Sequence, residues 1–335
     1  MQPDVRQNLS QDRMRRSRSA RKRLEKRVAS AYLLRCMTAQ PLMPPIVAHD
    51  HAALRAAAEA GAGLCTIVGI EGSFSRRLGA QLAVHADGAV TGSLADGCLE
   101  RQLASEIGAG GQRRVMRFGA GSPLIDFRLP CGSGLDILID PAPDRAACRA
   151  ALARLAARAE AALDLPVQGS SGFLERRLYV PALQILLFGE GPELDAVTAL
   201  GRAAGLAVDI RARDDAALSL GQRPHGLGAD RWTAVALLFH DHEWEQSILE
   251  WALETPAFYI GAQGGRQARE ERLQRLTGAG LGGDAIARVR SPVGIVKHSR
   301  EPVALALSAL AQIVGEYESL HPHQSARFEP ETLER

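Results

Sequence analysis

The sequence predicts an α/β protein with an N-terminal α+β domain followed by a C-terminal Rossmann-like domain, whose doubly wound sheet is parallel. Two observations predict this. The first half holds short strands separated by polar turns, including the hairpin signal Asp87-Gly88. In the second half strands alternate with helices, and the strand at 185–188 is an uninterrupted apolar run, which suits the centre of a parallel sheet.

Length and composition agree with this division. The chain has 335 residues, which corresponds to about two domains. Hydrophobic residues make up 46% and charged residues 23%, which excludes a disordered chain and a small disulfide scaffold. No apolar run approaches the ~18 residues of a membrane-spanning helix. The five cysteines form no CxxC pair, so we expect reduced thiols and a location in the cytoplasm.

The net charge is distributed unevenly. The formal charge is +2, but residues 1–35 hold eleven Lys and Arg against three acidic residues, so the rest of the chain is mildly acidic. We expect residues 1–45 to form a basic, disordered tail. A nucleic-acid-binding function would depend on this tail alone, because the body has no basic stripe with interleaved aromatics.

The predicted elements of the first domain, residues 46–165, follow in chain order. A short Ala-rich helix over 50–60 is ended by Gly61 and Gly63. Apolar, strand-sized segments predict strands at 64–70, 81–84, 89–92, 114–118 and 135–139. Helices are expected at 99–107 and 145–163, and residues 166–181 are expected to be a linker.

The second domain, residues 182–320, has the alternating pattern. Strands are expected at 185–188, 206–210, 234–239 and 257–260. One helix follows the first strand and ends near 204, another begins at Arg266, and the last runs from about Pro302 to Glu316 with Ser299 as its N-cap. Residues 321–335 are expected to be a C-terminal tail.

Ligands of such sheets bind outside the carboxyl ends of the strands. The loop with Gly189 and Gly191 resembles a dinucleotide turn, but Glu190 and Glu193 would repel a diphosphate at the helix N-terminus. NAD(P) is therefore the less favoured cofactor. The alternative is a tight turn between strand and helix and nothing more.

Two further loops follow strands of the same sheet. His240-Asp241-His242 could bind a metal, hydrogen-bond a heterocycle or move protons, unless these are ordinary loop residues with Asp241 capping a helix. The loop containing Gly261 and Gly264 leads into a helix whose first turn carries Arg266 and Arg269. We therefore expect this loop to bind an anion better than the loop with Gly189 and Gly191 does. Here the alternative is a glycine-rich turn whose arginines face water.

Two cysteines of the first domain lie in glycine loops. Cys98 lies at the N-terminus of the helix expected over 99–107, a position that favours thiolate, although the charge of Glu100 works against it. Cys131 and Gly132 belong to a Pro-Cys-Gly-Ser-Gly loop with room for a ligand. Thiolates suit soft metal centres and sulfur transfer, whereas the alternative is a pair of structural cysteines.

Taken together, these motifs resemble the XdhC/CoxI family, the maturation factors of xanthine and carbon monoxide dehydrogenases. The resemblance spans about residues 46–318 and is carried by the order of several motifs. These are Gly72-Ser73, Gly79-Ala80, Asp87-Gly88, Gly92, Gly97-Cys98-Leu99-Glu100, Leu129-Pro130-Cys131-Gly132, Leu187-Phe188-Gly189-Glu190-Gly191, His240-Asp241-His242, Tyr259-Ile260-Gly261, Gly264 and Ser291-Pro292-Val293-Gly294.

The resemblance implies a non-catalytic chaperone that binds molybdenum cofactor, as molybdopterin or its dinucleotide form, and delivers it to an apo-molybdoenzyme of the xanthine dehydrogenase type. It also implies a homodimer and a cysteine desulfurase as a further partner. On this model Cys98 and Cys131 meet the molybdenum, and the loops at 240 and 261 hold the pterin and the phosphate. An NAD(P)-dependent oxidoreductase is the alternative.

Overall fold

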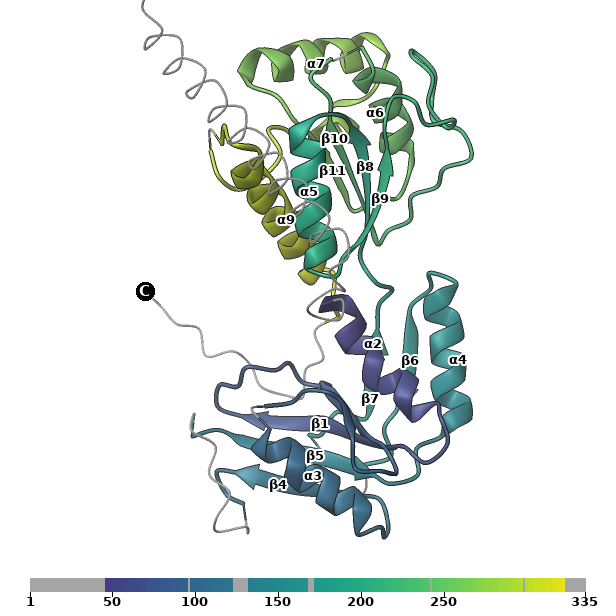
Figure 1. Cartoon of the computed structure of the whole chain (residues 1–335), viewed down its shortest axis with the longest axis vertical. Coiled ribbons are helices and arrows are strands. Elements are labelled where there is room, and N and C mark those ends of the chain that lie inside the picture. The colour runs from purple at the N-terminus through teal and green to yellow at the C-terminus, as the bar shows by residue number, and fades with distance from the viewer. Residues whose placement is uncertain are drawn as a thin grey trace, which may run out of the picture. The chain divides into compact units, whose positions relative to one another are not determined.

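The computed structural model describes residues 46–95, 97–122, 132–167, 172–241, 243–297 and 299–322 (Figure 1). The expected tail at 1–45 and most of the expected tail at 321–335 lie outside these residues, as do Asp96, Cys131, His242 and His298. Among the described helices, none is both long and apolar enough to cross a membrane.

The first half is built on an antiparallel sheet in the order β3-β2-β1-β5-β4. Its strands are β1 (Gly63–Glu71), β2 (Gln81–Val84), β3 (Val90–Gly92), β4 (Arg114–Gly119) and β5 (Gly134–Asp140). The predicted hairpin is present, because β2 and β3 pair with Val84 opposite Val90. The central strand β1 pairs with both β2 and β5 and is buried along most of its length.

Helices cover both faces of this sheet. Alternate residues of β1 point to opposite sides, so Leu64 packs with α2 (Ile46–Ala57) and α4 (Arg145–Ala156), while Cys65 and Ile67 pack with α3 (Cys98–Gly108). Apart from the helix expected over 145–163, the expected strands and helices of this half are therefore present, with ends that differ by a few residues.

The end of α4 corrects the prediction of a helix over 145–163. The helix stops at Ala156, and Arg158 adopts a left-handed backbone conformation with φ of 60°. A short strand β6 (Ala161–Asp164) follows and pairs antiparallel with β7 (Arg176–Tyr179). Part of the segment expected to be a linker is thus an ordered strand.

The second half is a parallel sheet in the order β12-β11-β10-β8-β9. Its strands are β8 (Gln184–Gly189), β9 (Ala207–Arg211), β10 (Thr233–Leu238), β11 (Tyr259–Ala262) and β12 (Val289–Arg290). Strands β8 and β10 are neighbours at its centre, with Ile185 opposite Ala234. Their near-complete burial explains their uninterrupted apolar sequences.

Helices lie on both faces of the parallel sheet (Figure 1). Ile185 and Leu187 pack toward α5 (Pro192–Ala203) and α9 (Pro302–Glu318), while Leu186 and Phe188 pack on the side of α6 (Glu245–Glu254) and α7 (Arg266–Gly278). A short helix α8 (Gly283–Ala287) precedes β12. Ser299 is not the cap of α9: the N-cap is Glu301, whose side chain makes no capping bond, and Pro302 begins the helix.

Candidate functional site

A groove in the first half runs beside the start of α3. Its volume is about 510 Å³. Its walls come from the β2–β3 hairpin, the turn before α3 and the first turns of α3, and most of its residues are small; they are Gly88, Ala89, Val90, Gly92, Ser93, Ala95, Gly97, Glu100, Arg101 and Ala104. Small side chains leave the backbone of this wall open to a ligand.

Cys98 adjoins this groove as the first residue of α3. Its side chain is exposed, and Arg101, one turn along the helix, donates a hydrogen bond from Nη2 to Sγ at 3.1 Å. Gly97 caps the helix with φ of 97°, a conformation that favours glycine. Arg101 is absent from the sequence-based expectations, yet its i+3 spacing from Cys98 could have revealed it.

Glu100 holds the turn that carries Cys98. Its carboxylate accepts hydrogen bonds from the backbone N–H groups of Leu94, Ala95 and Gly97 at 2.8, 2.6 and 2.8 Å. Burial favours a higher pKa for Glu100, but these N–H groups outweigh it and hold the pKa below its ordinary value. The carboxylate faces the backbone, so its geometry suits positioning of the Cys98 turn.

The other described cysteines differ from Cys98. Burial raises the pKa of Cys65 to about 12 and that of Cys148 to about 11, with Asp140 and Asp144 respectively as the next causes. Both thiols lie inside the two cores that flank the antiparallel sheet. Cys131 lies outside the described residues, whereas its neighbour Gly132 is exposed.

A second cluster lies where β8 and β10 end in the parallel sheet. Gly189 ends β8 and Gly191 follows it, while His240 and Asp241 follow β10, so these two expected loops converge. Nε2 of His240 is 3.2 Å from Oε2 of Glu193, which brings α5 into the cluster. His242 lies outside the described residues.

Arg213 also belongs to this cluster, although the sequence by itself did not single it out. Its Nη2 is 2.8 Å from Oε1 of Glu190 and 3.2 Å from Oδ2 of Asp241. The guanidinium also lies over the ring of Trp244, 5.6 Å from its centroid. It follows β9, so only the order of strands in the folded sheet brings it to the loops after β8 and β10.

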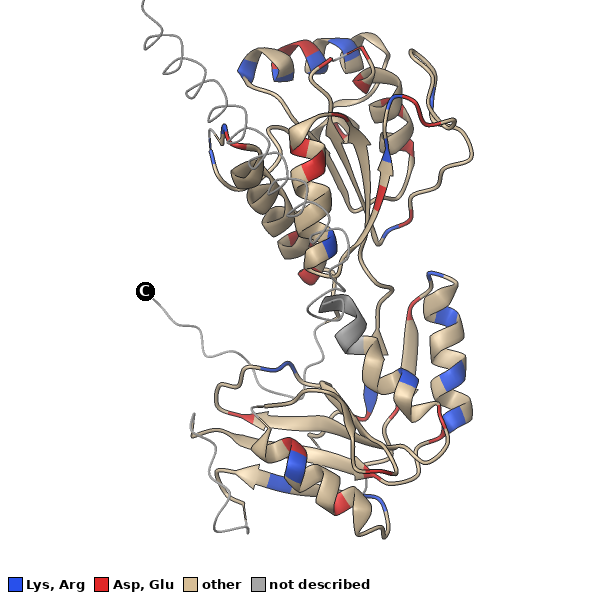
Figure 2. Cartoon of the chain, viewed as in Figure 1, with Lys and Arg blue, Asp and Glu red and all other residues tan. Residues whose placement is uncertain are grey.

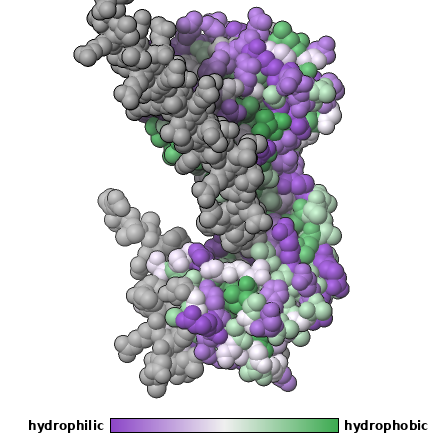
Figure 3. All heavy atoms as spheres, in the orientation of Figure 1, coloured by the Kyte–Doolittle hydropathy of each residue, from purple (hydrophilic) through white to green (hydrophobic). Residues whose placement is uncertain are grey.

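The loop after β11 leads into a helix with a different charge. No acidic residue lies in the first turn of α7, which starts at Arg266, and both Arg266 and Arg269 have exposed side chains. Figure 2 shows basic residues together with acidic ones along α7, and acidic residues at the start of α5. Figure 3 shows a mainly hydrophilic surface over α7. Gly261 is buried, and a Cβ there would lie 2.6 Å from the ring of its neighbour Tyr259. The backbone beyond it, at Gly264, has φ of 133°.

The structure thus groups the expected residues into two sets. Cys98, Glu100 and the groove belong to the antiparallel half, whereas Gly189, Gly191, His240, Asp241, Gly261 and Gly264 belong to the parallel half. Within the described ranges, no three His, Cys, Asp or Glu side chains are placed to hold a metal ion together.

The chain is similar to known proteins both in sequence and in fold. Residues 185–313 match the model of the XdhC Rossmann domain, and residues 55–119 match that of the XdhC and CoxI family. Over 270 residues the chain is 33% identical to the molybdenum cofactor insertion chaperone PaoD of Escherichia coli (strain K12), covering 76% of this chain and 82% of that protein. A crystal structure of a xanthine dehydrogenase from Bacillus halodurans has a similar fold, with a TM-score of 0.61 and 19% identity over 81% of this chain and 96% of that one.

Proposed function

Because the chain belongs to the XdhC and CoxI family, we propose that it is a chaperone that carries molybdenum cofactor to an apo-molybdoenzyme of the xanthine dehydrogenase type. Its 33% identity to a molybdenum cofactor insertion chaperone is the observation that carries this proposal. The cofactor is cargo here, and no reaction on it is assigned to the chain. We propose that the chaperone acts in the cytoplasm as a homodimer. We also propose that it binds a cysteine desulfurase.

In this proposal the metal–sulfur end of the cargo lies in the groove beside Cys98. The exposed thiol could approach molybdenum or its sulfur ligand, because thiolates suit soft metal centres. Glu100 would keep the turn in place through its three backbone N–H partners. Cys131 and the adjacent Gly132 would supply a second thiol loop.

The parallel half would hold the organic part of the cargo. A pterin carries N–H donors and ring acceptors, which His240, Asp241 and His242 could pair with after β10. The phosphate would lie at the loop with Gly261 and Gly264, since the start of α7 carries Arg266 and Arg269 without a nearby first-turn acid. Gly189 and Gly191 would border the pterin.

The test is an anaerobic titration of the full chain with molybdenum cofactor. Bound pterin is quantified by fluorescence after oxidation of the gel-filtered complex, with NAD and NADP titrated in parallel. We expect about one pterin per chain with micromolar or tighter affinity. No pterin binding together with saturable NAD(P) binding would replace the chaperone by the oxidoreductase alternative.

Two variants of α3 test the groove. Cys98→Ala removes the exposed thiol with little change in volume, and Ser105→Ala changes an exposed residue of the same helix as the control. We expect Cys98→Ala to retain the cofactor at least about tenfold more weakly than the wild type. Ser105→Ala should retain it as tightly as the wild type. Equal retention in both would remove Cys98 from the proposed site. Transfer of molybdenum cofactor from the loaded chain to a purified apo-xanthine dehydrogenase tests whether an enzyme of this type is the client.

A further inference from the structure

The glycine turn after β8 has the outline of a dinucleotide site, but its glycines have structural causes. A Cβ at Gly189 would lie 2.8 Å from the carbonyl oxygen of Leu238, so the close contact of β8 with β10 requires glycine. Gly191 is the N-cap of α5 with φ of 82°, a conformation in which other residues are strained. Neither glycine therefore indicates that a phosphate approaches the backbone.

A carboxylate of the chain itself lies at this turn. Oε2 of Glu193, in the first turn of α5, is 3.8 Å from the position of a Cβ on Gly191. The same oxygen is 3.2 Å from Nε2 of His240, and the side chain of Glu193 is only 14% exposed. A phosphate at the N-terminus of α5 would have to displace this held anion.

The basic side chain beside the turn is already engaged. Arg213 pairs with Glu190 at 2.8 Å and with Asp241 at 3.2 Å. Asp209, where a ribose-binding acid is expected, forms an ion pair with Arg211 at 2.7 Å. A diphosphate at this turn would lie close to three carboxylates, those of Glu190, Glu193 and Asp241. The one guanidinium there is already paired, so the repulsion between the carboxylates and the diphosphate would not be offset.

We infer that Glu190 and Glu193 close the glycine turn to diphosphates, and that they are the residues by which this Rossmann-like half rejects nicotinamide dinucleotides. A dinucleotide of any kind, including a dinucleotide form of the proposed cargo, must keep its diphosphate away from this turn. The inference stands apart from the proposed function, because its probe is NADH and its outcome does not depend on cofactor binding.

The experiment compares NADH binding by the full chain and three variants. Glu190→Gln removes one of the two carboxylate partners of Arg213 and leaves Asp241 as the other. Glu190→Gln/Glu193→Gln also neutralises the carboxylate at the start of α5. Glu243→Gln removes one exposed carboxylate from the loop after β10 and is the control for net charge. Binding is measured by calorimetry and by energy transfer from tryptophan to NADH, and circular dichroism and thermal midpoints verify folding.

We expect no saturation of the wild type or of Glu243→Gln up to millimolar NADH. The double variant should bind at least about tenfold more tightly, with Glu190→Gln in between. Micromolar binding by the wild type would overturn the inference. So would a folded double variant that binds NADH no better than Glu243→Gln.

Discussion

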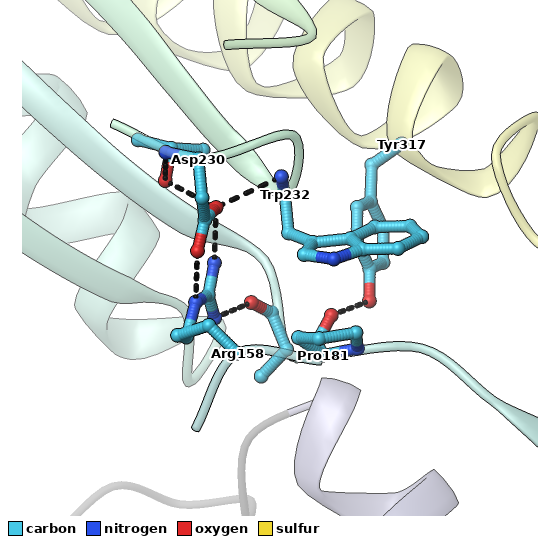
Figure 4. A network of polar contacts seen from close by, with 7 residues as sticks. Arg158, Pro181, Asp230, Trp232 and Tyr317 are labelled. Carbon is cyan, nitrogen blue, oxygen red and sulfur yellow. Dashed lines mark hydrogen bonds and ion pairs between the residues drawn. The ribbon is translucent and has the colours of Figure 1, made fainter. Parts of the chain in front are cut away.

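The guanidinium of Arg158 forms two hydrogen bonds with the carboxylate of Asp230, which lies 72 residues further along the chain (Figure 4). The Nε–Oδ2 distance is 2.6 Å and the Nη2–Oδ1 distance is 3.0 Å. Asp230 also accepts hydrogen bonds from the backbone of Trp232 and the hydroxyl of Thr233, so it joins the end of α4 to the start of β10. Nearby, Tyr317 of α9 donates to the carbonyl oxygen of Pro181 at 2.8 Å.

We expect Asp230→Asn to lower the free energy of unfolding by about 1–3 kcal/mol, because it removes a charge-assisted pair that is about two-thirds buried. Glu160→Gln is the matched control: it breaks a neighbouring ion pair, with Arg231, in which both side chains are mostly exposed. Its cost should stay below about 0.5 kcal/mol. Urea unfolding measures both, and equal costs would contradict the importance of the Arg158–Asp230 pair.

Glu100→Gln should destabilise the chain by about 2 kcal/mol at pH 7, since three backbone N–H groups lose a charged acceptor. Glu59→Gln replaces an exposed carboxylate after α2 and should have little effect. Thermal unfolding of the two variants provides the comparison. A loss in Glu100→Gln no larger than that in Glu59→Gln would argue against the turn-holding role.

The same carboxylate predicts a pH dependence. The folded pKa of Glu100 lies below its ordinary value of 4.5, so its contribution to stability is present above pH 4.5 and is lost as the pH falls through the folded pKa. The free energy of unfolding of the wild type should therefore decrease with acidification over this range. In Glu100→Gln the decrease should be smaller, as urea unfolding at successive pH values would show. Parallel curves for the two proteins would contradict this assignment.

Alkylation should distinguish the described thiols. At pH 8 iodoacetamide should modify Cys98, which is exposed, at least about tenfold faster than Cys65 or Cys148, whose burial raises their pKa values to about 12 and about 11. Peptide mass mapping against time gives the three rates separately. In urea the three rates should converge, and similar rates in the folded protein would be the contrary result.

The buried pair of Glu245 and Arg272 should be sensitive to removal of one partner. Their side chains are 3% and 6% exposed, and Arg272 also bonds Ser291 and the carbonyl oxygen of Gln263. Glu245→Ala should cost about 3–5 kcal/mol because it leaves a buried charge without its main partner. Glu271→Ala, which removes an exposed partner of Arg275, is the control and should cost less than about 1 kcal/mol. Similar unfolding midpoints in urea would contradict the prediction.

Local sequence determined most elements of both halves and the loops that follow the parallel strands, but not β6, β7 or β12. Apolar runs and glycine punctuation are local signals, so β2, the Asp87-Gly88 hairpin and the alternation from β8 onward follow from the sequence alone. The acidic character of the turn after β8 was equally readable, because Glu190 and Glu193 adjoin its glycines. Local signals could not show where α4 ends, because the residue with the left-handed backbone there, Arg158, is an arginine and not the glycine that usually marks such an end.

The tertiary structure decided which of these groups meet. Glu193 pairs with His240 across 47 residues, and Arg213 reaches Glu190 and Asp241 only because β9, β8 and β10 are neighbours in the folded sheet. The backbone periods that reveal helices and strands repeat over a few residues, whereas such pairs depend on strand order and on the path of the loops. The physical reason is that side-chain pairing over long separations is a property of the packed chain, and no local pattern encodes it.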